Sequence, residues 1–300
     1  MASVRRSYLQ LIFEAIGLPI LPDYWDYQYK VNHQFDSYNS LLITGIGSID
    51  DFAVNELDEF DAQQQAVQDQ VPVIKQKSNT VGATWSRRFK DASGNMRLTL
   101  STNRLENQFS QFNDNVNQEG LYFQNDATEQ EIKLRLNVTK FLGEWITSYG
   151  GSIQNVDYSN ATTDVVNNAN FNANMNLYRY GAFFQTSRSI NNRNSVSVGI
   201  RLDGNSFMES GNDIWNTLSP RFSYSYKITK NGNWTLNGSL GRYYKIPPYT
   251  ILGFKDNSGK FVNQNTKYIR TDHGVLGIEY LINKSSRITL EAFWKQYASY

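Results

Sequence analysis

The chain has 300 residues, 29 of them Lys or Arg and 28 Asp or Glu, and its net charge of +1 argues against nucleic-acid binding, which needs clustered basic excess. The absence of cysteine excludes disulfide scaffolds, thiolate metal sites and cysteine nucleophiles. Aromatic residues make up 14% of the chain although the mean hydropathy is −0.54, and no apolar run approaches the roughly 20 residues of a membrane-spanning helix. So many aromatic side chains must be buried or face lipid.

The N-terminal segment predicts a short strand and one helix. A strand stub is expected over residues 3–8, and the mixed run of residues 9–16 is the best helix candidate in the chain. Gly17 and Pro19 follow this run and form a helix stop signal. Strands dominate the remainder, because few helices of any length fit between the later segments.

From Trp25 onward, apolar and polar residues alternate with a period of two, which is typical of strands with two different faces. The clearest case is 131–139, where Ile132, Leu134, Leu136 and Val138 point one way and Lys, Arg, Asn and Thr point the other. The same alternation occurs in five other segments, at 25–35, 196–203, 221–228, 234–240 and 288–294.

Connections of two lengths separate these strands. Short turn signals occur at 37–40, 92–95, 142–144, 191–194, 231–233 and 284–286. Longer polar stretches alternate with them, near 55–77, 111–127, 159–173, 210–216 and 251–266. This alternation is typical of outer-membrane barrels, with tight periplasmic turns and long extracellular loops. We therefore predict an all-β fold, an antiparallel transmembrane β-barrel segment of about 12–13 strands.

Aromatic residues support a membrane location for this sheet, because such barrels carry aromatic girdles at both edges of an apolar band about 25 Å tall. Trp145 and Trp234 each lie next to a short turn. Tyr243 is nine residues after Trp234, a distance of roughly 23 Å along the membrane normal for a tilted strand. Tyr243 and Tyr244 are therefore expected at the opposite girdle.

Several segments together resemble TonB-dependent outer-membrane receptors. The later part of the receptor barrel is matched in order and spacing by 219–227, 241–250, 268–280 and 288–297, and the middle of the barrel by 4–10 and 18–30. The resemblance implies a barrel of about 22 strands that is filled by an N-terminal plug. It also implies import of a bulky, scarce ligand, driven by the proton-motive force through TonB.

The resemblance implies a partial domain and a set of partners. We expect residues 1–300 to be part of an outer-membrane barrel domain, without the plug, a signal peptide or the remaining strands. The expected partners are outer-membrane lipid, the plug and through it TonB, and an extracellular ligand whose identity the sequence does not give. The expected location is the bacterial outer membrane, and we expect no nucleic acid and no cofactor.

Two other functions remain open at this point. A complete barrel of 12 strands over 25–300 would be a passive porin-like channel. A soluble secreted all-β protein would instead use its exposed aromatic residues to bind glycans. Replacing Leu236 by Arg distinguishes a membrane barrel from the soluble protein. The substitution should destabilise the fold by about 2–4 kcal/mol at the middle of a lipid-facing surface and by little at a surface in water.

Candidate functional residues are few. We expect Tyr243, Tyr244, Tyr249, Arg270 and Asp272 to line an extracellular ligand vestibule. We expect no catalysis and no metal site, because the two histidines, His33 and His273, lie on distant strands without ligand-spaced partners.

Charged residues give two further expectations. The basic residues on the lumen-facing side are expected to pair with acidic residues of neighbouring strands or with the plug, and the two sets are Lys133, Arg135, Arg201, Arg221 and Lys227, with Asp203, Glu279 and Glu291. The acidic, Gln-rich stretch 56–70 could attract a cationic ligand but more commonly would be a solvated loop.

Overall fold

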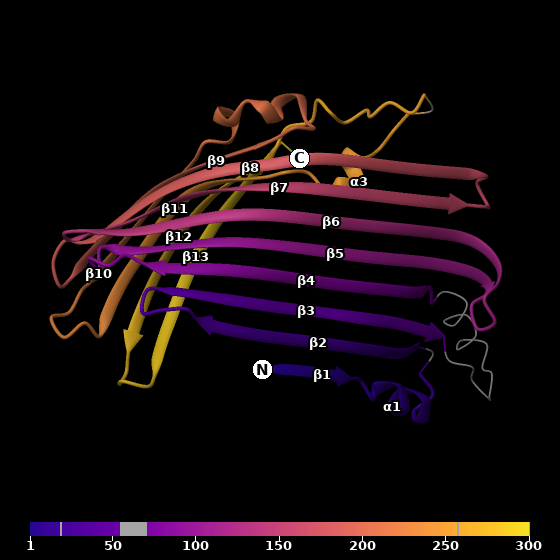
Figure 1. Cartoon of the computed structure of the whole chain (residues 1–300), viewed down its shortest axis with the longest axis horizontal. Helices are drawn as coiled ribbons and strands as arrows, with labels where there is room; N and C mark the ends of the chain where they lie inside the picture. Colours follow the sequence, from indigo (N-terminus) through magenta and orange to yellow (C-terminus); the bar gives the residue numbers. More distant parts are fainter. Residues whose placement is uncertain (19, 55–70, 257, 300) are drawn as a thin grey trace.

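The computed structural model describes residues 1–18, 20–54, 71–256 and 258–299. In this part of the chain, 13 strands form one antiparallel sheet in sequence order. They are β1 (Ala2–Arg6), β2 (Ile20–Gln34), β3 (Asn39–Val54), β4 (Val73–Arg88), β5 (Gly94–Asp114), β6 (Glu119–Leu142), β7 (Trp145–Asp164), β8 (Ala169–Ser189), β9 (Asn194–Asn205), β10 (Ser219–Lys227), β11 (Trp234–Lys245), β12 (Ile269–Leu281) and β13 (Arg287–Ala298). The sheet curls, so that β10–β13 cross the line of the earlier strands in Figure 1.

The predicted fold class and strand number are confirmed, with 12 strands after the β1 stub. The predicted N-terminal helix is α1 (Leu9–Ala15), which ends before Gly17 at a φ of +67°. Two 3-10 helices, η1 (Glu209–Asn212) and η2 (Ile214–Thr217), and the one-turn helix α3 (Tyr249–Leu252) lie in connections. Among the described residues, no helix has the length and apolar character needed to cross a membrane.

All six predicted short turns lie at one end of the sheet, which we call the turn end. At the opposite, loop end, two stretches that we expected to be loops are strands. Residues 111–127 and 159–173 continue β5–β8 as long hairpins, which close at 115–118 and 165–168 (Figure 1). The expectation was wrong because Asn, Thr and Gln keep the backbone ladder and no Pro interrupts it. Asp114 and Asp164 close the two tips by accepting backbone N–H groups.

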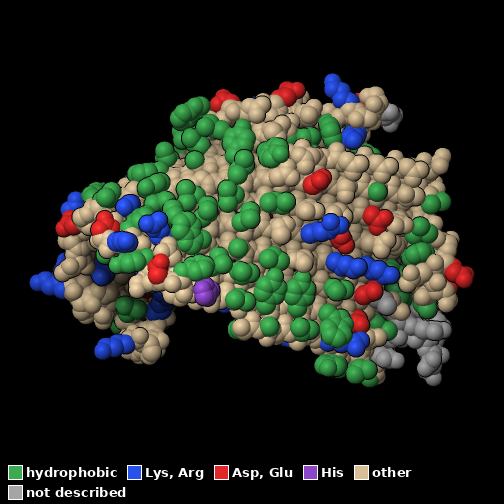
Figure 2. All heavy atoms as spheres, in the orientation of Figure 1, with side chains coloured by type: hydrophobic (Ala, Val, Ile, Leu, Met, Phe, Trp, Pro, Cys, Tyr) green, Lys and Arg blue, Asp and Glu red, His purple; other side chains and the backbone are tan. Residues whose placement is uncertain are grey.

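Cross-strand register fixes the two faces of the sheet. Leu100 pairs with Leu134 and Leu134 with Ile153, so their side chains share a face, and 42–55% of each residue is exposed. We call this the apolar face, and Figure 2 shows hydrophobic side chains spread across the middle of the molecule. Lys133 and Gln154 pair on the opposite, polar face. The two-faced alternation predicted from the sequence is thus present across several strands.

Tyrosines of β2 cover glycines of β3 on the apolar face. A Cβ atom at Gly45 would lie 2.3 Å from the ring of Tyr29, and one at Gly47 would lie 2.5 Å from the ring of Tyr27. Any other residue at either position would displace the ring. The glycines therefore let the two tyrosine rings lie flat against the sheet, and these cross-strand pairs help to keep β2 and β3 in register.

The sheet has two edges in the described part of the chain, β1 and β13, because β1 pairs with β2 and β13 pairs with β12. The backbone groups along the outer side of each edge strand are therefore open to another strand.

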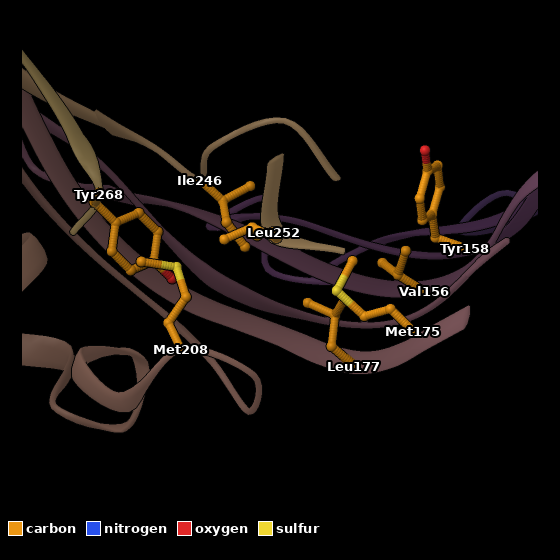
Figure 3. Close-up of a cluster of buried hydrophobic side chains, with 8 residues drawn as sticks. All are labelled: Val156, Tyr158, Met175, Leu177, Met208, Ile246, Leu252 and Tyr268. Atoms are coloured by element: carbon orange, nitrogen blue, oxygen red, sulfur yellow. The ribbon is translucent and has the colours of Figure 1, made fainter. Parts of the chain in front are cut away.

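A compact core lies at the loop end. The connection between β11 and β12, which we call the cap segment (residues 246–256 and 258–268), folds over the loop-end part of β7 and β8. A Cβ atom at Gly253 would lie 3.2 Å from Ala173 and 3.5 Å from Tyr158, and Phe254 stacks on Phe171 at 4.9 Å between ring centroids. The buried cluster shown in Figure 3 comprises Val156, Tyr158, Met175, Leu177, Met208, Ile246, Leu252 and Tyr268.

Candidate functional site

Basic side chains of the polar face line a shallow hollow of about 280 Å³ across β6–β10. Arg135, Arg201 and Arg221 belong to its wall, and Gly181 and Gly199 also line it. The hollow therefore presents guanidinium groups on a floor with little side-chain bulk, an arrangement that suits an anionic group or acidic side chains of another segment.

An ion pair within one strand closes part of this hollow. The Arg201 guanidinium lies 2.5 Å from the Asp203 carboxylate, two residues along the same strand. A Cβ atom at Gly181 would lie 2.5 Å from the same carboxylate, so the pair occupies the space above this glycine. Arg201 thus pairs within its own strand rather than with a neighbouring strand, as we had expected, and Glu279 pairs with Arg287 of the neighbouring strand β13, which we had not predicted.

Tyr243 lies at the centre of an aromatic and cationic cluster on the polar face. The register places Arg221 beside Gly241 and Gly241 beside His273. The Arg221 guanidinium lies 4.6 Å from the centroid of the Tyr243 ring, and the His273 ring centroid lies 4.7 Å from it. Gly241 lets the Tyr243 ring lie against the backbone, because a Cβ there would be 2.9 Å from that ring.

Tyr249 lies in the cap segment and is held by residues that we had not singled out. Its hydroxyl accepts a hydrogen bond of 3.0 Å from Arg179 of β8, and the guanidinium of Arg179 lies 4.0 Å from Glu131 of β6. The Tyr158 ring packs 5.8 Å away. Burial raises the pKa of the Tyr249 hydroxyl, so this group stays protonated.

The other three predicted residues, Tyr244, Arg270 and Asp272, lie on the apolar face of β11 and β12. They follow the last apolar side chain of this face, Leu240, toward the loop end. Arg242 donates to Asp272 at 2.7 Å, and Arg270 lies 3.6 Å from the same carboxylate. The structure thus divides the five predicted vestibule residues. Tyr243 faces the polar side, Tyr249 lies in the cap segment, and the other three form a cluster on the opposite face from Tyr243.

Two other expectations have a place in the structure. His33 lies on the apolar phase near a short turn, with its ring 4.7 Å from that of Phe35. The acidic stretch 56–70 lies outside the described residues. Within the described ranges, no group of three His, Cys, Asp or Glu side chains is placed to hold a metal ion.

Sequence reasoning missed Arg179, Glu131 and Tyr158, which hold the cap segment. One signal was present in the sequence, since the stretch that we read as a polar loop contains Ile251, Leu252, Phe254 and Phe261. Apolar residues at this density predict a packed segment rather than a solvated loop.

Comparison with known proteins gave a family match and structural neighbours. Residues 17–300 match the family model described as TonB dependent receptor-like, beta-barrel. A mutant of the ferric enterobactin receptor PfeA from Pseudomonas aeruginosa superposes with a TM-score of 0.68 at 14% identity, covering 92% of this chain and 42% of that chain. No curated protein matched the sequence.

Two other solved structures are similar. The copper transporter OprC has a TM-score of 0.66 at 14% identity, covering 89% of this chain and 43% of that chain. The siderophore receptor PirA from Acinetobacter baumannii has a TM-score of 0.63 at 12% identity, covering 93% and 43%. The chain thus spans less than half the length of the proteins that it resembles.

Proposed function

Because the chain belongs to the TonB-dependent receptor-like β-barrel family, we propose that it forms barrel wall of an outer-membrane receptor for active uptake of a bulky ligand. The observation that carries this proposal is the family match over 17–300, on a sheet whose apolar side chains stay exposed along one face. Uptake through TonB, and a receptor rather than a catalytic role, belong to the same proposal.

The barrel wall described here is proposed to be one part of a larger assembly. The edges at β1 and β13 support this, because each unsatisfied backbone group in lipid costs several kcal/mol. Further strands would close the barrel, and a plug would fill it. The exposed arginines of the polar face would then contact the plug or an anionic ligand.

Part of the vestibule proposal is kept. Tyr243, with Arg221 and His273 beside it, and Tyr249 offer aromatic and cationic surface near the loop end, which supports a role in ligand contact. Tyr244, Arg270 and Asp272 lie on the phase of the apolar face, where a ligand inside the barrel would not reach them.

The rival functions are less well supported. A porin of 12 strands needs a closed sheet, whereas β13 pairs only with β12 among the described strands. A soluble glycan-binding protein would need to keep apolar side chains such as Leu240 and Leu276 exposed to water.

Two substitutions on neighbouring residues of β11 test the proposal. Leu236 lies on the apolar face and Asn237 on the polar face at the same height. We expect Leu236→Arg to cost about 2–4 kcal/mol and to lower the amount assembled in the outer membrane, whereas Asn237→Arg should assemble normally. The measurement is the urea-resistant fraction in isolated outer membranes of cells that export the chain.

Equal assembly of both variants would contradict a lipid-facing surface on β11. Conductance in a planar bilayer separates the receptor from the channel. Stable conductance by the purified protein, without TonB, would favour the porin-like function and overturn the proposal.

A further inference from the structure

A shallow apolar groove of about 520 Å³ crosses the apolar face between β10 and β13. Its floor consists of three small residues, Gly238, Gly274 and Ala292, on three adjacent strands. Large apolar side chains form its walls, namely Phe222, Tyr224, Leu240, Leu276 and Trp294.

The two glycines of the floor are not required by the backbone. Neither has a positive φ, and a Cβ atom would be 3.9 Å from its nearest neighbour at Gly238 and 3.4 Å at Gly274. These are ordinary contact distances, so a larger residue could be accommodated, and its side chain would project into the groove. What the glycines provide is the open space itself.

Positive charge lies at the loop end of the groove. Arg242 lies two residues after Leu240 on β11, on the same face of the sheet. It pairs with Asp272 of β12, which lies two residues before Gly274. Arg270 lies beside the same carboxylate. Two guanidinium groups thus share one carboxylate, which leaves one positive charge on the lipid-facing phase of the sheet.

The height of this charge agrees with a membrane interface. At the turn end of the same face, Trp234 and Tyr280 stack with 4.4 Å between ring centroids. Eight residues separate Trp234 from Arg242, which corresponds to roughly 20 Å along the normal for a strand tilted by about 40°. Since short turns are periplasmic in such barrels, Arg242 lies near the headgroups of the outer leaflet.

We propose that this groove binds an anionic, phosphate-bearing lipid of the outer leaflet. One acyl chain lies over Gly238, Gly274 and Ala292, and the phosphate contacts Arg242 and Arg270. Charge complementarity selects this occupant, because Asp272 balances only one of the two guanidinium groups and an uncharged apolar partner would leave the remaining positive charge without a counterion. The inference rests on the membrane location that is part of the proposed function.

Retention of lipid by the full chain, assembled in the outer membrane and extracted in detergent, tests the inference. The probes are dipalmitoyl phosphatidylglycerol and dipalmitoyl phosphatidylcholine, which differ in headgroup charge, and bound lipid is counted by native mass spectrometry. We expect about a tenfold preference for phosphatidylglycerol, lost in the double variant Arg242→Gln, Arg270→Gln. Gly238→Val, which fills the floor, should weaken retention of both lipids about tenfold.

Matched controls are available on β4 and β5. Arg104 also lies on the apolar phase beside an acidic residue, Glu106, and Arg104→Gln should leave the preference unchanged. Gly82 lies on the polar face with its nearest neighbour 3.6 Å from a Cβ, and Gly82→Val should leave retention unchanged.

Three outcomes would overturn the inference. Equal retention of the two lipids by an assembled wild-type chain would show that Arg242 and Arg270 do not select the headgroup, and it would leave the proposed function intact. A Gly238→Val variant that loses self-association instead of lipid would assign the groove to a second copy of the chain. Retention of both lipids by Gly238→Val at the wild-type level would show that no acyl chain occupies the groove.

Discussion

Apolar side chains occur in two regions of the sheet and have opposite environments there. In the apolar band, which covers about the first ten residues beyond each short turn, Leu100, Leu240 and Leu276 are 55–64% exposed. At the loop end, Val156, Leu177 and Leu252 are at most 1% exposed. The same residue types are thus left open in one region and fully covered in the other.

The difference indicates two solvents along one sheet. On the proposed function, lipid would take the place of a protein core in the band, so apolar side chains would need no protein cover there. At the loop end the strands carry Asn, Thr and Gln on both faces and extend into water, where the few apolar side chains must be covered. The cap segment supplies that cover, which explains why an apolar helical turn, α3, interrupts an otherwise polar connection.

The largest expected contrast comes from one truncation in each region. Leu177→Ala leaves a cavity under the cap segment and should cost about 2–5 kcal/mol locally, because rigid neighbours cannot close it. Leu100→Ala should cost less, because lipid fills the space. Protease cleavage within the cap segment of membrane-inserted protein measures the first effect, and the urea midpoint of membrane extraction measures the second.

The comparison fails if Leu177→Ala leaves cleavage of the cap segment unchanged. It also fails if the free-energy cost of Leu100→Ala, from the extraction midpoint, equals that of Leu177→Ala, from cleavage of the cap segment. Either result would mean that one packing environment extends through both regions.

A smaller effect is expected at the hydrogen bond that fixes the cap segment. Tyr249→Phe removes the acceptor of Arg179 and should loosen the segment by about 1 kcal/mol, below the usual value for a charged donor because Arg179 is 38% exposed. Cap-segment cleavage should rise severalfold. Tyr178→Phe, at an exposed position beside Arg179, is the control and should change nothing.

Much of the fold was predictable because β-strands with one apolar and one polar face carry a local signal. Alternation at period two, as in 131–139, gives strand identity and face together, and antiparallel order follows from the short turns. Turn positions were predictable for the same reason, since Asn, Gly and Ser gather where the alternation stops.

The hairpin tips and the cap segment were not predictable in this way. Polar stretches such as residues 124–131 in the first half of β6 have no apolar phase, so alternation does not indicate where such strands begin or end. The cap depends on contacts between residues far apart in sequence, such as Arg179 with Tyr249, 70 positions away. The division of the candidate site depends on strand register, which separates Tyr243 from Tyr244 although they are neighbours in sequence.

The smallest expected effect, a dependence on alkaline pH, should also be confined to the loop end. Burial raises the pKa of both Tyr249 and Tyr268 above the ordinary value of 10.0, and for Tyr268 burial outweighs the opposing hydrogen bond from Asn205. A raised folded-state pKa gives stability that is complete below pH 10 and is lost as the pH rises, because the unfolded segment ionises first. The cap segment should therefore become sensitive to an alkaline protease above about pH 10, while the double variant Tyr249→Phe, Tyr268→Phe should lose most of this dependence. A fall in the urea midpoint of membrane extraction at the same pH would show that the apolar band and the cap segment are not independent.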